Sequence, residues 1–160
     1  MKISYLFLFI LLTFFLVFID QYTKALFIKG FSLKLNEYVR FILVYNEGSA
    51  FGIKLFSNQT YIVLAITACL LIILFNIFYN IKLASLKNRN LINLFNLSMV
   101  LILSGTMGNL LDRIKYSKVV DWISILNFPV FNLADSYITT GVIIFLYFYF
   151  KLEKINQKTK

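Results

Sequence analysis

The chain has 160 residues, of which 60% are apolar and only 14% are charged, and its net charge at neutral pH is +9. Soluble domains are about 45–50% apolar, so the composition excludes an ordinary water-soluble core and predicts one membrane-embedded domain over residues 1–160. The sequence contains no histidine. This excludes Ser-His-Asp and Cys-His proteases and every zinc site that uses histidine.

The basic residues lie in loops and at the ends of apolar runs. They form no dense stripe interleaved with aromatic side chains, so we expect no nucleic-acid partner. Instead, Lys and Arg are expected to anchor the spans and to contact membrane lipids through anionic head groups. The single cysteine, Cys69, lies inside an apolar run and is interpreted as a small apolar residue of a membrane helix.

Four uncharged runs occupy residues 3–19, 55–81, 90–111 and 136–150. About 20 helical residues cross a hydrocarbon core. We therefore predict an all-α polytopic membrane protein with spans at approximately 3–22, 59–81, 90–111 and 133–150, joined outside by segments 23–58 and 112–132. The first run resembles a secretory signal, but no pair of small residues follows it for cleavage, so it is a retained span.

The outer segment 23–58 has a different pattern from the spans. Phe31, Leu33 and Leu35 alternate with polar residues, and residues 41–45 form a second β-prone run. Both patterns are typical of strands. We therefore predict a small β-rich extracytoplasmic segment between spans 1 and 2.

A turn is predicted at the end of this β-prone run, where Asn46, Glu47 and Gly48 follow one another. Gly48 and Gly52 would let the backbone approach a ligand closely. Turns that contain Asn and Gly are common, so this signal alone carries little weight.

Four spans place both termini on the same side of the membrane. On that side Lys and Arg are concentrated in short segments at the span ends, whereas on the other side they are spread over long segments. The density of basic residues near span ends sets orientation, so we predict cytoplasmic termini. Six of the seven acidic residues then lie on the outer side, namely Asp20, Glu37, Glu47, Asp112, Asp121 and Asp135. We expect any carboxylate chemistry at the outer leaflet.

Asp135 is expected at or below the hydrocarbon boundary. The fourth uncharged run has only 15 residues, so its helix must begin near Asp135 if it is to cross the membrane. No basic residue lies within a helical turn of this carboxylate. An ionisable side chain at such a depth is costly and is a functional hypothesis by default.

Two other acids have simple structural interpretations. Asp20 has Lys24 four residues further on, which is the spacing of an interfacial ion pair on a helix. Asp112 stands next to Arg113 at the end of the third run, where it can be a span-end salt bridge or cap.

Asp121 follows two valines and precedes Trp122, an interfacial aromatic, so we expect it at head-group depth near Asp135. A re-entrant turn at Pro129 would bring the two acids face to face. Two adjacent carboxylates in a low-dielectric site cannot both ionise at neutral pH, so one holds a proton. Such a pair can act on water as general base and on a carbonyl as general acid, and the pattern assigns neither role to either residue.

Two other functions stay open at this point. Membrane acids also serve as proton relays in transporters, although a carrier is expected to show internal repeats and broken helices at the bilayer midplane. The sequence shows no such repeat. A non-catalytic scaffold would leave Asp135 unexplained.

Five short strings, in order, resemble the motifs of one family: IDQYTK at 19–24, NEGSAFG at 46–52, GNLLDR at 108–113, VVDW at 119–122 and FNLADSYITTG at 131–141. On a four-span chain of this length, they resemble lipoprotein signal peptidase, also called signal peptidase II. The chain differs from the usual family pattern at Ser104-Gly105, where two glycines are common, and at Ser49, where Ala is common. Both changes replace one small residue by another.

The resemblance implies a membrane aspartic endopeptidase that cleaves a prolipoprotein just before a cysteine carrying a diacylglyceryl group, with no metal or cofactor. It implies that Asp121 and Asp135 are the catalytic dyad. The implied substrate-binding residues are Asn46, Gly48, Asn109, Arg113 and Asn132, and the implied supporting residues are Asp20, Lys24, Asp112 and Ala134. The expected location is the bacterial cytoplasmic (inner) membrane, with the active site at the outer-leaflet face, and we expect a monomer.

Overall fold

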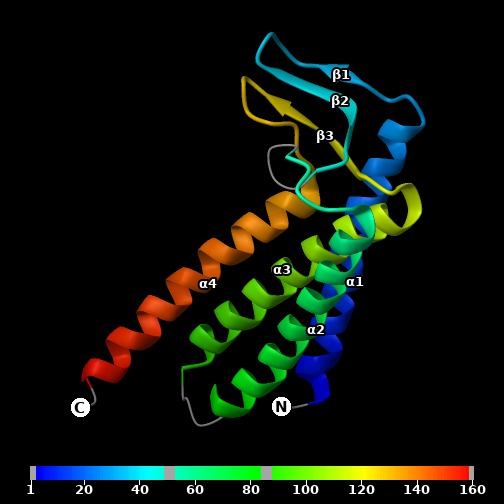
Figure 1. Ribbon diagram of the computed structural model, residues 1–160. Helices are drawn as coiled ribbons and strands as arrows, with labels where there is room; N and C mark the ends of the chain where they lie inside the picture. The colour runs from blue at the N-terminus through cyan, green and yellow to red at the C-terminus, as the bar shows by residue number, and fades with distance from the viewer. Residues whose placement is uncertain (1–2, 49–52, 84–87, 159–160) are drawn as a thin grey trace.

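The computed structural model describes residues 3–48, 53–83 and 88–158. Its elements are, in chain order, α1 (Ile3–Ile28), β1 (Leu33–Lys34), β2 (Val39–Asn46), α2 (Asn58–Leu83), α3 (Arg89–Tyr116), β3 (Val119–Ile125) and α4 (Leu133–Lys158). Figure 1 shows the helices side by side with the sheet over one end of them. The first turn of α1 and the last turn of α4 lie at the opposite end.

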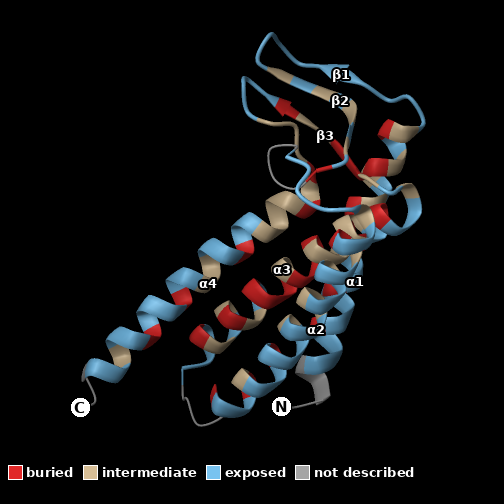
Figure 2. Ribbon diagram, viewed as in Figure 1, coloured by how far each residue is buried: buried red, intermediate tan, exposed pale blue. Residues whose placement is uncertain are grey.

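The predicted fold class is confirmed. Each of the four helices is long and apolar enough to cross a membrane. Figure 2 shows exposed residues along the outward faces of α1, α2 and α4, and many of these residues are large and apolar, such as Phe18, Leu74 and Phe150. A hydrophobic outer face is what lipid requires of a span, because lipid tails solvate apolar side chains.

The helices run past the predicted span ends at 22, 111 and 150, since α1 continues to Ile28, α3 to Tyr116 and α4 to Lys158. The predicted ends at 111 and 150 precede the first charged residue after each apolar run, and the predicted end at 22 lies shortly after Asp20. Charged side chains do not stop a helix, because Lys, Arg and Glu are good helix formers. Polar side chains therefore continue on helical turns beyond the apolar runs.

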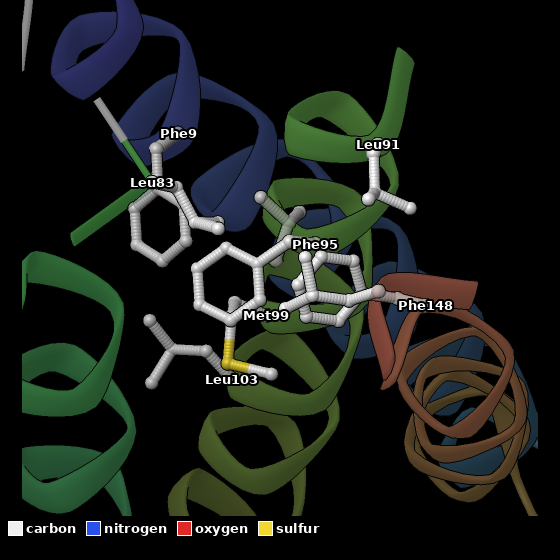
Figure 3. Packing of buried hydrophobic residues seen from close by; sticks show 9 residues of the cluster. Phe9, Leu83, Leu91, Phe95, Met99, Leu103 and Phe148 are labelled. Carbon is white, nitrogen blue, oxygen red and sulfur yellow. The ribbon is translucent and has the colours of Figure 1, made fainter. Parts of the chain in front are cut away.

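Helix α3 is the central element and packs against each of the other three helices. Its apolar half carries Phe95, which is fully buried and lies with its ring centroid 5.2 Å from that of Phe148 in α4. Tyr79 in α2 approaches the same ring at 5.0 Å. Figure 3 shows Phe95 and Phe148 within the buried apolar cluster, in which Met99 and Leu103 of α3 continue the contact surface. The core thus lies at the end of the bundle away from the sheet.

Small residues set the distance between α3 and α4. A Cβ atom on Gly105 would collide with the backbone oxygen of Ala134 and would lie 2.6 Å from the Ile138 side chain. A Cβ atom on Gly141 would lie 2.7 Å from the Ile102 side chain. These two helices therefore approach closely at the sheet end only because glycine occupies the contact positions.

The sheet has the order β1-β2-β3 and is antiparallel throughout. The predicted β-rich segment between spans 1 and 2 supplies β1 and β2, and the third strand comes from the segment between α3 and α4. In the β2–β3 register, Val44 is opposite Asp121 and Asn46 is opposite Val119. Trp122 stacks on Phe27 of α1 with ring centroids 4.5 Å apart, which holds the sheet against the end of that helix.

Candidate active site

The predicted site residues meet where the sheet lies against the helix ends. Asp121 comes from β3, and Asp135 comes from the first turn of α4. Side chains from α1, α3 and β2 surround them. The sequence-predicted Gly48 also lies here, whereas Gly52 and Ser49 lie outside the described residues.

Asp121 is buried, with 2% of its surface exposed, and amide groups engage both of its oxygens. Asn132 Nδ2 donates to Oδ1 at 2.7 Å, and Asn46 Nδ2 donates to Oδ2 at 3.1 Å. Burial, and then the negative charge of Asp135, raises the pKa of Asp121 from 3.8 to about 6, although the two amide hydrogen bonds act in the opposite direction. This carboxyl is therefore able to hold a proton close to neutral pH.

Asp135 is part of a reciprocal cap at the start of α4. The backbone N–H of Asp135 donates to Asn132 Oδ1 at 2.9 Å, and the backbone N–H of Asn132 donates to Asp135 Oδ2 at 3.2 Å. This is the arrangement of a capping box, with Asp135 at the third helical position. The remaining oxygen, Oδ1, accepts from Asn109 Nδ2 at 2.8 Å.

Asn132 connects the two aspartates. It is fully buried, its side-chain oxygen caps α4 at Asp135, and its side-chain nitrogen donates to Asp121. The same nitrogen lies 3.1 Å from Asn109 Oδ1. One amide thus fixes the relative position of the strand that carries Asp121 and the helix that carries Asp135.

A buried lysine supports this arrangement. Lys24 Nζ lies 2.8 Å from Asp20 Oδ2 and 2.7 Å from Asp112 Oδ2, and all three side chains are excluded from solvent. The same ammonium donates to Asn109 Oδ1 at 3.1 Å. Because that oxygen accepts from Lys24, the amide nitrogen of Asn109 is turned toward Asp135.

The acids of this cluster also hold backbone groups of the site in place. Asp20 Oδ1 accepts from the backbone N–H of Ala134 at 3.0 Å. Asp112 Oδ2 accepts from the backbone N–H of Val120 at 3.0 Å. The charged residues from α1 and α3 therefore position the residues that directly precede Asp135 and Asp121.

Arg113 lies beside the dyad at the end of α3. Its Nη2 donates to the backbone oxygen of Gly48 at 2.6 Å, and its guanidinium carbon lies 4.1 Å from the centroid of the Tyr61 ring. Asn58, the first residue of α2, donates to the backbone oxygen of Arg113 at 3.1 Å. Nη1 of Arg113 is buried and hydrogen-bonds to no atom of the residues that the structure describes.

A cavity of about 640 Å³ opens beside these groups. Its polar wall carries Asp135, Asn109, Asn46 and Arg113. The rest of its wall is mostly apolar or hydroxylated. Gly48 and Val119, the first residue of β3, contribute to it, and the other lining residues come from the segment before α4 and the first turns of that helix: Phe128, Pro129, Val130, Phe131, Ser136, Ile138, Thr139 and Thr140. Asp135 reaches this cavity directly, whereas Asp121 lies behind the amide of Asn46.

The catalytic, substrate-binding and supporting residues implied by the resemblance are all among the described residues, and they lie in one connected set of contacts. Three further residues were not singled out. Gln21 donates to Asp112 Oδ1 at 2.9 Å and to the backbone oxygen of Gly108 at 3.0 Å. Asn58 and Tyr61 contact Arg113 from α2. Gln21 stands within the IDQYTK string, but nothing in the sequence marks the other two.

Comparison with known proteins gives one consistent result. Residues 12–151 match the family model Peptidase_A8, described as Signal peptidase (SPase) II. A lipoprotein signal peptidase from Caldanaerobacter subterraneus subsp. tengcongensis is 39% identical over 139 residues, covering 83% of this chain and 89% of that protein. A lipoprotein signal peptidase from Burkholderia multivorans is 34% identical over 140 residues, covering 80% and 78%.

Two solved structures, both of bacterial membrane enzymes obtained by the in meso method, have a similar fold. The first has a TM-score of 0.74 and 27% identity, covering 95% of this chain and 91% of that one. The second has a TM-score of 0.70 and 26% identity, covering 87% and 90%. The structural similarity thus covers most of this chain in both comparisons.

Proposed function

Because the chain belongs to the signal peptidase II family and is therefore a protease that removes signal peptides from lipoproteins, we propose that Asp121 and Asp135 are its catalytic pair. The proposed substrate is a prolipoprotein whose cysteine already carries a diacylglyceryl group, and the bond cut is the one just before that cysteine. Membership of a peptidase family leaves the carrier and scaffold hypotheses without support.

The observation that carries this proposal is the bridge that Asn132 makes between the two carboxyl groups: its side-chain nitrogen donates to Asp121, and its backbone N–H donates to Asp135. It joins Asp135, which lines the cavity, to Asp121, which is buried behind Asn46 and whose pKa is raised to about 6 by burial and by the charge of Asp135. A pair that shares one proton suits acid–base catalysis of peptide hydrolysis.

In the proposed reaction the ionised carboxylate takes a proton from water as the water oxygen attacks the scissile carbonyl carbon. The protonated carboxyl donates its hydrogen bond to the carbonyl oxygen, which gains negative charge. The proton then passes to the leaving amine nitrogen, the carbon–nitrogen bond breaks, and the pair returns to its starting state with one proton. The two acids titrate together, so the pair, and not either residue, has the apparent pKa values of the reaction.

The cavity suits a substrate with both a peptide and a lipid part. Its polar wall presents the amide groups of Asn46 and Asn109 and the guanidinium of Arg113, which donate to peptide carbonyl oxygens. Its apolar wall, including Val130 and Ile138, offers a surface for acyl chains. We place this cavity at the outer leaflet, with both termini in the cytoplasm.

The test is cleavage of a purified precursor in detergent, with and without the diacylglyceryl group. The wild-type protein should cleave the lipid-modified precursor and leave the unmodified one nearly intact. Asp121→Asn and Asp135→Asn should each abolish cleavage, because an amide keeps the shape of the carboxyl but cannot accept a proton from water. Near-normal turnover by either variant would refute the dyad.

The matched control is Glu153→Gln, an exposed acid of α4 far along the helix from Asp135. It should cleave like the wild type. Each variant should also show a cooperative thermal unfolding transition, which demonstrates that an inactive variant is still folded.

A further inference from the structure

The ring of Tyr61 forms a platform for the guanidinium of Arg113. The guanidinium carbon lies 4.1 Å from the ring centroid, which is the geometry of a cation–π contact. Both side chains are about 8% exposed, so little water competes for the charge. Tyr61 lies outside every string that resembles the family motifs.

Tyr61 is itself held in place from several sides. Its hydroxyl accepts from the backbone N–H groups of Leu55 at 3.0 Å and Phe56 at 3.4 Å, and it lies 3.5 Å from the backbone oxygen of Ile53. The ring of Phe56 meets its edge with centroids 5.8 Å apart. The platform is therefore rigid, and the hydroxyl and the ring face have separate partners.

One terminal nitrogen of the Arg113 guanidinium has a hydrogen-bond partner, and the other is buried without one among the described residues. Nη2 donates to the backbone oxygen of Gly48 at 2.6 Å, whereas Nη1 donates to no atom within the described part of the chain. Arg113 lines the cavity that also contains Asp135. A planar guanidinium offers its donors in one fixed plane, so stacking on a ring determines where Nη1 points.

We propose that Tyr61 is a positioning residue for substrate binding, whose ring face holds Arg113 so that Nη1 meets a backbone carbonyl of the bound signal peptide. The inference rests on the proposed function, because it takes Arg113 as a substrate contact. We expect Tyr61 to act on substrate binding, through Arg113, and to leave the chemical step unchanged.

The first test compares Tyr61→Leu with Tyr61→Phe in the cleavage assay. Tyr61→Leu removes the ring and should raise KM about tenfold with little change in kcat, since cation–π contacts of this kind contribute about that much. Tyr61→Phe removes only the hydroxyl and should retain a KM close to that of the wild type. Equal impairment of both variants would assign the effect to the hydroxyl contacts with residues 53–56 and overturn the proposal, as would an unchanged KM in Tyr61→Leu.

A second test keeps the shape of the ring and changes only its charge distribution. Phenylalanine analogues with one, two and three fluorine atoms at position 61 withdraw electron density from the ring face step by step. The logarithm of KM should rise with each added fluorine, and a flat series would overturn the proposal. This series also decides the matter if Tyr61→Leu does not fold.

A measurement without turnover separates this inference from the proposed function. The chain has three arginines, at positions 40, 89 and 113, so NMR signals of their side-chain Nε–H groups can be assigned by substitution. The Arg113 signal should show a ring-current shift in the wild type and in Tyr61→Phe, and should lose it in Tyr61→Leu. If the Arg113 signal is shifted but the protein cleaves no precursor, the proposed function is refuted and the stacking of Arg113 on Tyr61 still holds. If the wild-type signal is not shifted, the stacking itself is refuted.

Discussion

The two aspartates of the candidate site have different surroundings. Asp135 lies at the N-terminal turn of α4 and accepts from a backbone N–H and from Asn109, a position that suits a negative charge. Asp121 lies on a strand behind Asn46 and is buried. We therefore expect the shared proton to reside on Asp121 in the resting protein.

This location of the proton predicts a pH dependence of stability. The folded-state pKa of Asp121, about 6, is above its unfolded value of 3.8, so its contribution to stability is fully present below pH 4 and is lost as the pH rises through about 6. The loss amounts to at most about 3 kcal/mol. Melting temperatures in detergent should show the wild type losing stability relative to Asp121→Asn between about pH 4 and pH 7.

A constant difference between the two proteins across this range would contradict that location of the proton. The comparison with Asp121→Asn is needed because other ionisable groups of the protein also contribute to the pH dependence of its stability. Since the amide at position 121 does not titrate, only the contribution of this carboxyl is removed.

Arg113 gives a second prediction for a single side chain. In Arg113→Lys the charge remains, but an ammonium cannot donate to Gly48 and to the substrate in the planar arrangement of a guanidinium. The kcat/KM for the lipid-modified precursor should decrease about 10- to 100-fold, as expected for the loss of a hydrogen bond to a charged group.

Arg89→Lys, an exposed arginine at the other end of α3, is the control and should leave kcat/KM unchanged. If Arg113→Lys also left it unchanged, Arg113 would be only an anchor at the end of the span.

The sequence indicated individual residues of the site to different degrees. The start of the fourth helix close to Asp135 followed from the short fourth run, and the proximity of Asp135 to Asp121 was expected from the re-entrant turn at Pro129. The roles of Asn109 and Asn132 came only from the resemblance, because an asparagine in a helix or loop has no periodic signal. Tyr61 and Asn58 were missed, since their contacts with Arg113 join residues more than 50 positions apart.

Among the contacts between elements, the site depends most on the packing of α3 against α4. Gly105 and Gly108 of α3 face Ala134, the residue before Asp135. Since interiors are close-packed, an added methyl group at such a contact must move one of the helices. The site geometry therefore depends on small residues that make no hydrogen bond to it.

Gly105→Ala should consequently impair activity. The new Cβ would collide with the backbone oxygen of Ala134, and the resulting displacement of the start of α4 should lower kcat by at least about tenfold, because shifts of about 1 Å in catalytic groups are costly. Melting in detergent should show a loss of about 1–3 kcal/mol from overpacking. Leu111→Ala, on an exposed position of α3, is the control.

Near-normal kcat in Gly105→Ala would show that α4 can shift without moving Asp135 relative to Asp121. The capping box and the Asn132 bridge would then be sufficient to hold the pair.

The helices were well indicated by the sequence, and the sheet was indicated in part. Long uncharged runs predict membrane-spanning helices without ambiguity. The alternation at Phe31, Leu33 and Leu35 indicated the β-rich segment. Strand β3 gave no such signal, because Val119, Val120 and Asp121 are all buried and the strand does not alternate. Its pairing with β2 joins segments some 75 residues apart, and such pairing depends on the tertiary fold.

At the scale of the whole molecule, sidedness is the main prediction. The sheet lies at one end of the bundle, and the first turn of α1 and the last turn of α4 lie at the other (Figure 1). Asp121 belongs to this sheet, and Asp135 lies at the end of α4 next to it. In a Cys69→Ser background, Lys118→Cys should react with a membrane-impermeant thiol reagent added outside intact cells. Lys154→Cys should react only when the reagent reaches the cytoplasm.

Labelling of both positions from the same side would contradict the even number of spans. Reaction of Lys154→Cys from outside, with Lys118→Cys protected, would reverse the orientation and place the site at the inner leaflet. Either result is measured against the unlabelled Cys69→Ser protein.

The buried ion pairs have a consequence for how the chain enters the bilayer during synthesis. Lys24 pairs with Asp20 four residues before it on the same helix, so α1 can leave the translocation machinery with these two charges already neutralised. Asp112 reaches Lys24 only when α3, made later, docks on α1. Lys24 thus has a partner in the bilayer before the second acid arrives, and docking of the third span completes the Lys24 ion-pair cluster before β3 and α4 bring in Asp121 and Asp135.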